Sequence, residues 1–141
     1  MTHRSVAAIV VACLTALFVV VACGSSSSTS LPGSTWTVTS INGKTTEAEG
    51  TPTIEFGSDG TVAGTTGCNR YGGNVTIDGD KIAFGQMSST LIGCEGAIAD
   101  QEQAFLAAMD GATNWSVGSS GDLTIKGAGD IVARPIEQPP S

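Results

Sequence analysis

Residues 53–84 read TIEFGSDGTVAGTTGCNRYGGNVTIDGDKIAF, and the predicted architecture begins with this segment. Two runs of alternating apolar and polar residues flank the GSDG of residues 57–60, and two more flank the DGD of residues 78–80. Such alternation is typical of strands that bury one face, and short turns rich in glycine and aspartate join antiparallel neighbours. The segment therefore predicts two consecutive β-hairpins.

The same alternation occurs on both sides of these hairpins. Residues 35–40 predict a strand that places Trp36, Val38 and Ser40 on one face. Three more short strands are predicted near the C-terminus, separated by turns rich in serine and glycine, around residues 115–117, 123–125 and 131–133. Short strands in this succession indicate a mostly antiparallel sheet.

One segment predicts a helix, from about residue 95 or 97 to Met109. Its apolar residues recur at helical spacing and form one stripe, made up of Ile98, Phe105, Leu106 and Met109. Several of its polar residues are expected outside this stripe, namely Asp100, Gln101 and Gln103. Gly111 is expected to end the helix, because glycine accepts the left-handed backbone of a helix terminus. The predicted fold class is α+β, a small, strongly curved, barrel-like and mostly antiparallel sheet with one covering helix.

The N-terminus has the parts of an export signal that ends in a lipid attachment point. After a short basic start, an uncharged apolar run ends in Val20-Val21-Ala22-Cys23, which resembles the bacterial lipobox. Cleavage before Cys23 divides the chain into a lipoprotein signal peptide, a lipidated cysteine with a serine-rich tether, a domain and a tail, at residues 1–22, 23–30, 31–137 and 138–141. The alternative is an uncleaved signal anchor, because the run is about the 20 residues that cross a bilayer.

Lipidation would hold the protein in the bacterial cell envelope, on the extracytoplasmic face of a membrane. Acyl chains on Cys23 bury enough methylene groups to anchor a small domain without a further membrane-binding patch. The membrane, reached through this lipid, is thus the first expected partner.

Charge and composition exclude several functions. Without residues 1–22 the chain keeps five basic side chains against thirteen acidic ones, a net charge of about −8. This balance argues against a nucleic-acid partner, since phosphates require clustered lysine and arginine. The single histidine, His3, lies in the signal peptide, so the domain lacks the usual base of a serine or cysteine nucleophile and the commonest metal ligand. We therefore expect no catalytic residues, no metal and no cofactor.

The densest motif is Gly67-Cys68-Asn69-Arg70-Tyr71, followed by Gly73. With the segments around it, the chain resembles the META domain family, which includes HslJ-like heat-shock lipoproteins. The resemblance covers residues 31–137 and rests on Leu31 and Trp36, Ile54 and Phe56, Gly64, the Gly-Cys-Asn core at 67–69, Thr90 and Cys94, and the helix residues Glu102, Phe105 and Leu106. It implies that the motif residues Gly67, Asn69, Arg70, Tyr71, Thr90 and Glu102 are structural.

Cys68 and Cys94 are expected to form a disulfide. Cys23 is committed to lipid and Cys13 is discarded with the signal, which leaves these two in a compartment that does not keep thiols reduced. The alternative is a reactive or redox pair, but the chain has neither the Cys-x-x-Cys spacing nor a histidine to form a thiolate.

Polar residues of two turns have a structural and a functional interpretation. Asn69 and Arg70 could contact a ligand, but Asn69 is expected to cap a turn and Arg70 to lie on a solvated edge. Asp78 and Asp80 flank a glycine as in a calcium loop, yet without further oxygen ligands a plain hairpin turn is expected.

Three carboxylates near the helix, at Glu95, Asp100 and Glu102, could supply acid/base chemistry. Asp100 and Glu102 are two residues apart on a helix and point to different sides, so a solvated helix face is expected instead. The protein is therefore predicted not to be an enzyme.

The family resemblance implies a non-enzymatic envelope lipoprotein that acts through protein or small-molecule contacts. The family is associated with heat shock, novobiocin resistance, secretion and virulence, so a role in envelope stress tolerance or integrity, with an envelope protein as possible partner, is expected. The alternative is a carrier of an apolar ligand or a lipoprotein like the secretin pilots, by analogy of fold alone. The two differ in whether the larger aromatic side chains fill the interior or line an open cavity, namely Trp36, Phe56, Phe84 and Trp115.

Overall fold

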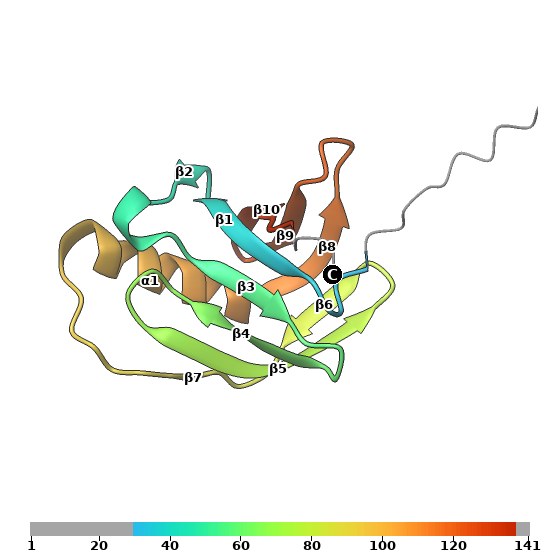
Figure 1. The fold of residues 1–141 in the computed structure, drawn as a ribbon, viewed down its shortest axis with the longest axis horizontal. Coiled ribbons are helices and arrows are strands. Elements are labelled where there is room, and N and C mark those ends of the chain that lie inside the picture. The colour runs from blue at the N-terminus through green and yellow to red at the C-terminus, as the bar shows by residue number, and fades with distance from the viewer. Residues whose placement is uncertain (1–29, 138–141) are drawn as a thin grey trace, which may run out of the picture.

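The computed structural model describes residues 30–137. The predicted signal peptide, Cys23 and the tail at 138–141 lie outside the described residues. The described chain has one α-helix, a short 3-10 helix and ten strands, as Figure 1 shows: β1 (Thr35–Ile41), β2 (Lys44–Thr45), η1 (Ala48–Gly50), β3 (Thr53–Phe56), β4 (Thr61–Thr65), β5 (Arg70–Asp78), β6 (Lys81–Phe84), β7 (Ser88–Ser89), α1 (Gly96–Asp110), β8 (Ala112–Val117), β9 (Leu123–Gly127) and β10 (Asp130–Pro135).

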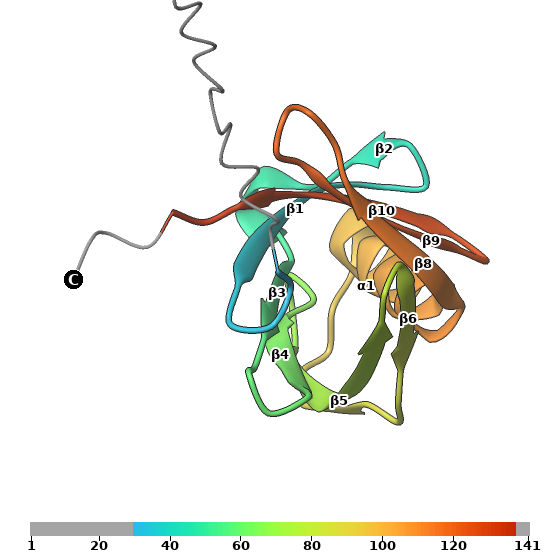
Figure 2. The same cartoon turned by 90° about the vertical axis from the view of Figure 1, so that its right-hand side faces the viewer.

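Eight of the strands close into a barrel. They follow the order β10-β9-β8-β6-β5-β4-β3-β1, and β1 pairs with β10 to complete the ring. Every pairing is antiparallel, β2 extends β1, and β7 pairs with β5 outside the ring. Helix α1 contacts β1, β6 and β10, and Figure 2 shows it within the outline of the ring of strands. The predicted fold class is confirmed.

The two predicted hairpins form the β3–β4 and β5–β6 pairs. Phe56 pairs with Val62 in the first hairpin, and Ile77 pairs with Ile82 in the second. The turn after β5 contains Gly79 at φ 58°, a left-handed conformation that glycine adopts without steric cost. The Asp78–Asp80 segment is thus a hairpin turn.

The core fills the interior of the barrel with the apolar faces of the strands and one face of the helix. Its largest fully buried side chains are Trp36, Phe56, Phe105, Leu31, Ile54, Met109, Leu123, Ile125 and Ile131. Burying each large aliphatic or aromatic side chain stabilises the fold by roughly 1.5–3 kcal/mol. Stability thus comes mainly from this shared core.

Strand β1 departs from the predicted alternation. Trp36 and Val38 are buried as expected, but the pairing with β10 shifts between Val38 and Ser40. A bulge of this kind adds one residue to a strand and turns the following side chains to the opposite face. Ile41, not Ser40, therefore enters the core, and the predicted position of Ser40 is wrong.

Helix α1 has nearly the predicted bounds, and Phe105 and Met109 are buried as expected. Gln101 was expected outside the apolar stripe, yet it is buried. Its amide is accepted there because both of its ends have hydrogen-bond partners, which are described with the site. In the part of the chain that the structure describes, no helix is long and apolar enough to cross a membrane.

Gly111 ends the helix, but for a different reason from the one expected. Its φ of −90° is not left-handed. A Cβ at this position would instead collide with the side chain of Ala128, in the turn between β9 and β10. The glycine permits a close approach of two backbone segments.

Candidate functional site

The motif residues lie where the turn between β4 and β5 meets the loop before α1. Thr66, fully buried, organises the turn: its amide donates to the Asn69 carbonyl at 2.8 Å, and its hydroxyl accepts from the amides of Cys68 at 3.3 Å and Asn69 at 2.9 Å. The side chain that caps this turn therefore belongs to Thr66. The prediction that Asn69 caps it is wrong.

The side chain of Asn69 reaches the loop before α1. Its Oδ1 accepts hydrogen bonds from the Thr90 hydroxyl at 2.9 Å and the Ile92 amide at 2.7 Å. Its Nδ2 donates to the Ile92 carbonyl at 3.1 Å and to Glu102 Oε1 at 2.9 Å. The Asn69 amide thus bonds both the N–H and the carbonyl of Ile92, as the backbone of a neighbouring strand would. The residue is only 4% exposed, so these hydrogen bonds lie in a site almost free of water.

Glu102 completes the connection from the helix. Its Oε1 accepts from the Thr66 hydroxyl at 2.7 Å as well as from Asn69, and its Oε2 lies 3.4 Å from Cys94 Sγ. Hydrogen bonds to a carboxylate are about twice as strong as neutral ones. Glu102 does not lie on a solvated helix face as expected; it joins α1 to the turn, while Glu95 and Asp100 are exposed.

Cys68 and Cys94 form a disulfide, as predicted, with Cα atoms 6.3 Å apart. This separation is within the range that a disulfide requires. Together with Glu102, the two sulfurs form a group of three potential metal donors within 4.8 Å. Cysteine binds metals as the thiolate, and the two sulfurs of a disulfide are not thiolates. The oxidised cluster therefore offers a metal ion only the carboxylate of Glu102.

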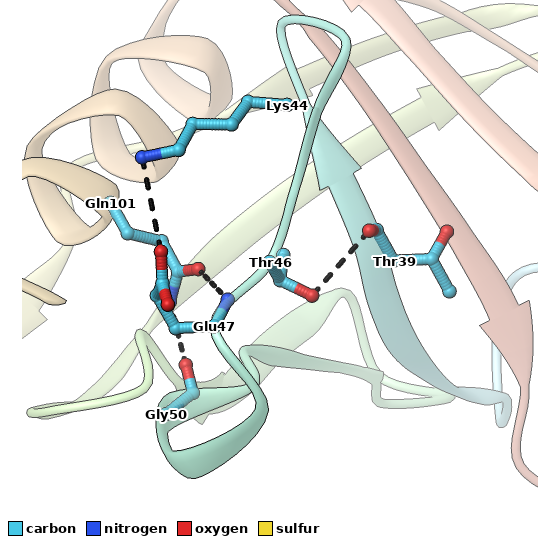
Figure 3. A network of polar contacts seen from close by, with 6 residues as sticks. All are labelled: Thr39, Lys44, Thr46, Glu47, Gly50 and Gln101. Atoms are coloured by element: carbon cyan, nitrogen blue, oxygen red, sulfur yellow. Dashed lines mark hydrogen bonds and ion pairs between the residues drawn. The ribbon is translucent and has the colours of Figure 1, made fainter. Parts of the chain in front are cut away.

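Gly67 permits a second close approach, between the turn and η1. Its φ is 99°, and a Cβ would collide with the Gly50 carbonyl. Gln101 lies beside this contact: it accepts from the Glu47 amide at 2.7 Å and donates to the Gly50 carbonyl at 2.6 Å, as Figure 3 shows. Sequence reasoning missed Gln101, because a glutamine off the apolar stripe has no local signal of burial.

The remaining motif residues hold the ends of the cluster. Arg70 is exposed, as expected, and its backbone bonds Thr90 through two hydrogen bonds of 3.0 Å. Tyr71 is buried, packs edge-on against Phe105 at 5.5 Å and donates its hydroxyl to the Thr53 carbonyl at 2.9 Å. Burial raises the pKa of Tyr71 far above its ordinary value, which keeps the phenol neutral.

Two hollows lie on the surface beside the helix. One, of about 240 Å³, lies between the β1–β2 turn and α1 and is lined by Ile41, Lys44 and Asp100 among others. A wider groove of about 570 Å³ lies between the segment after β6 and the C-terminal half of α1.

The polar cluster is built to hold the fold together. Every buried side-chain nitrogen or oxygen of residues 30–137 has a hydrogen-bond partner. A catalytic or ligand-binding group usually presents an unpaired atom to its substrate, whereas these atoms bond one another. The cluster therefore fixes the loop before α1 against the barrel.

The fold and this cluster define a small disulfide-braced antiparallel barrel with one helix. The META domain model matches residues 29–138, and the chain belongs to the META domain family. No curated protein matches the chain.

Solved structures share the fold. The chain is similar to a protein from Burkholderia xenovorans solved by NMR, at 18% identity and a TM-score of 0.62 over 77% of this chain and 85% of that one. A second NMR structure gives 19% identity and a TM-score of 0.62 over 74% and 90% of the two chains. The crystal structure of a DUF4847 family protein from Bacteroides vulgatus gives 16% identity and a TM-score of 0.54 over 77% and 96%. At such identities the likeness concerns the fold alone.

Proposed function

We propose that this protein is an envelope lipoprotein, anchored through Cys23, whose META domain acts by contact and not by catalysis. The role expected from the family, tolerance of envelope stress or maintenance of envelope integrity, would depend on that contact. The observation that carries the non-catalytic part is the satisfied polar cluster, in which Glu102 and Asn69 are occupied by structural hydrogen bonds.

The interior of the barrel supports contact over carriage of an apolar ligand. Trp36 and Phe56 are fully buried within the packed core, and the half-buried Phe84 ring lies 6.3 Å from that of Phe56. Trp115 is only half-buried at the rim, where its indole nitrogen donates to the Gly79 carbonyl at 2.9 Å. The aromatic side chains that a carrier would arrange around its ligand thus belong to the packed core or pack against it.

The anchor is tested by metabolic labelling with a radioactive fatty acid in the producing cells. The wild-type chain should take up label and fractionate with membranes, whereas Cys23→Ala should remain an unlabelled precursor. Cys13→Ala is the matched control, since Cys13 lies in the same apolar run and should not affect labelling. Label that persists in Cys23→Ala would contradict the anchor.

The non-catalytic role is tested in a strain that lacks the protein, by survival under heat and novobiocin. A Glu102→Gln variant keeps one acceptor oxygen, which can still accept the hydrogen bonds of Thr66 and Asn69 at lower strength, and it should restore survival wherever it folds. An enzymatic turnover that disappears in folded Glu102→Gln would contradict the proposal, and so would a ligand bound inside the barrel.

A further inference from the structure

Two large aliphatic side chains project from the loop between β7 and α1. Leu91 is 97% exposed and Ile92 is 61% exposed; we call this pair the knob. Its backbone is held firmly, because the Asn69 amide bonds both the N–H and the carbonyl of Ile92, and the disulfide at Cys94 follows two residues later. An apolar pair that a rigid loop holds in solvent favours a docking site over incidental exposure as the explanation.

The knob belongs to an uncharged strip of the surface. Residues 85–94 contain no lysine, arginine, aspartate or glutamate, although the chain after the signal peptide has a net charge of about −8. Figure 1 shows this segment running along one edge of the molecule, through β7 to the start of α1. Because like charges oppose the approach of two negatively charged copies, an uncharged strip such as this one is a surface where they can meet.

The wider groove adjoins the same strip and complements the knob. Its apolar lining includes Phe84, Met87 and Leu106, and Asp110 also lines it. We call it the groove from here on. An acceptor site of this kind, lined by aromatic, methionine and leucine side chains, suits aliphatic side chains such as those of the knob.

Two charges complete the match. Arg70 is exposed and bonds Thr90 of the knob loop through its backbone, and Asp110 is the last residue of α1. A carboxylate at a helix C-terminus is unfavourable for the helix itself. Among residues 30–137, neither Arg70 nor Asp110 takes part in the ion pairs, which join other residues.

We propose that the protein binds a second copy of itself, with the knob of each copy in the groove of the other and Arg70 paired with Asp110 across the contact. Knob and groove lie along one strip, so a two-fold axis would make the contact twice. The rigid loop lowers the conformational entropy lost on binding. A lipid surface suits the features less well, because the exposed carboxylate of Glu95 lies only three residues after Ile92.

The test uses two differently tagged full-length copies, co-expressed and co-purified from membranes. Arg70→Glu in both copies, or Asp110→Arg in both, should lower co-purification by at least about fivefold, since each change places like charges across the contact. One copy with Arg70→Glu and the other with Asp110→Arg should restore it. In that mixture each position 70 again faces an opposite charge at position 110 of the other copy, and in one of the two pairs the charges are reversed. An effect within a single copy cannot produce this recovery.

Leu91→Ser in both copies should also lower co-purification, and Ile136→Ser is its matched control, an aliphatic residue that is 43% exposed outside the strip. Equal loss in both variants would overturn the proposal. The proposal would also be overturned if the wild-type copies did not co-purify, or if the charge-swapped mixture did not regain co-purification. Co-purification that no variant lowers would overturn it too, because two copies held in one patch of lipid would co-purify without touching. Fatty-acid labelling of the same variants should stay unchanged, so a failure here is distinct from a failure of the anchor at Cys23.

Discussion

Replacing Asn69 with aspartate tests the central contact of the polar cluster. The change keeps the shape of the side chain but turns the donor Nδ2 into an oxygen, which then faces Glu102 Oε1 at the present 2.9 Å and the Ile92 carbonyl at 3.1 Å. Two hydrogen bonds are lost and two carboxylates oppose each other in a site that is 4% exposed. Because a broken buried pair leaves an uncompensated charge, we expect a loss of about 3–5 kcal/mol in the free energy of unfolding at pH 7.

The pH dependence distinguishes repulsion from simple loss of hydrogen bonds. In the folded variant the two carboxylates retain a shared proton to a higher pH than they do in the unfolded chain. The proton stabilises the folded state where it is bound, so the stability of the variant should fall as the pH rises above about 4. At pH 4 and below, the loss should shrink to about 1–2 kcal/mol, the cost of the missing hydrogen bonds.

Urea unfolding followed by the fluorescence of the buried Trp36 measures both quantities. Asn69→Ala should cost about 2–4 kcal/mol with little pH dependence, since it removes the hydrogen bonds without adding charge. Asn114→Asp is the control: its amide donates to Asp80 at 3.4 Å on the surface, and solvent should hold its cost below about 1 kcal/mol. A loss in Asn69→Asp that is equal at pH 4 and pH 7 would refute the assigned contact with Glu102.

Other substitutions test the disulfide, the core and the turn. Cys68→Ser should lower the free energy of unfolding by up to about 3–4 kcal/mol, from the chain entropy of a 26-residue separation, and an unchanged melting temperature without reductant would contradict the disulfide. Trp36→Ala should cost about 3–5 kcal/mol and the half-buried Trp115→Ala clearly less; the opposite order in chemical denaturation would show that the packing is misassigned. Gly67→Ala should destabilise more than Gly121→Ala, because both glycines have positive φ but only at Gly67 would a Cβ meet a neighbouring carbonyl; equal melting temperatures would contradict that collision.

Much of the secondary structure was predictable because its signals are local. Alternation over four to nine residues predicts strands such as β3 and β5, and apolar residues at helical spacing predict α1. The strands with no such pattern were missed: β2 and β7 have two residues each, too few to show a period. The bulge in β1 was also missed, since it depends on the pairing with β10 and not on β1 alone.

The candidate site was predictable in its members but not in its arrangement. The family resemblance identified Asn69, Thr90 and Glu102, and the export signal made the disulfide of Cys68 with Cys94 the expected pairing. The sequence did not reveal that the Asn69 side chain bonds residues 21 to 33 positions away, because such a hydrogen bond leaves no periodic pattern in the sequence. Gln101, whose partners are 51 and 54 positions away, was missed for the same reason.

The amino-acid sequence by itself determined the longer strands, the helix and the disulfide partners: the strands and the helix follow from the period of their apolar residues, and the disulfide follows from the export signal and the cysteine count. Tertiary structure alone decided which polar side chains are buried together and which apolar ones remain outside. Closure of the barrel brings the turn after β4 against the loop before α1, and the hydrogen bonds of Asn69 then hold Leu91 and Ile92 in solvent. Burial is a property of distant segments meeting in space, and neither the cluster nor the knob exists until they do.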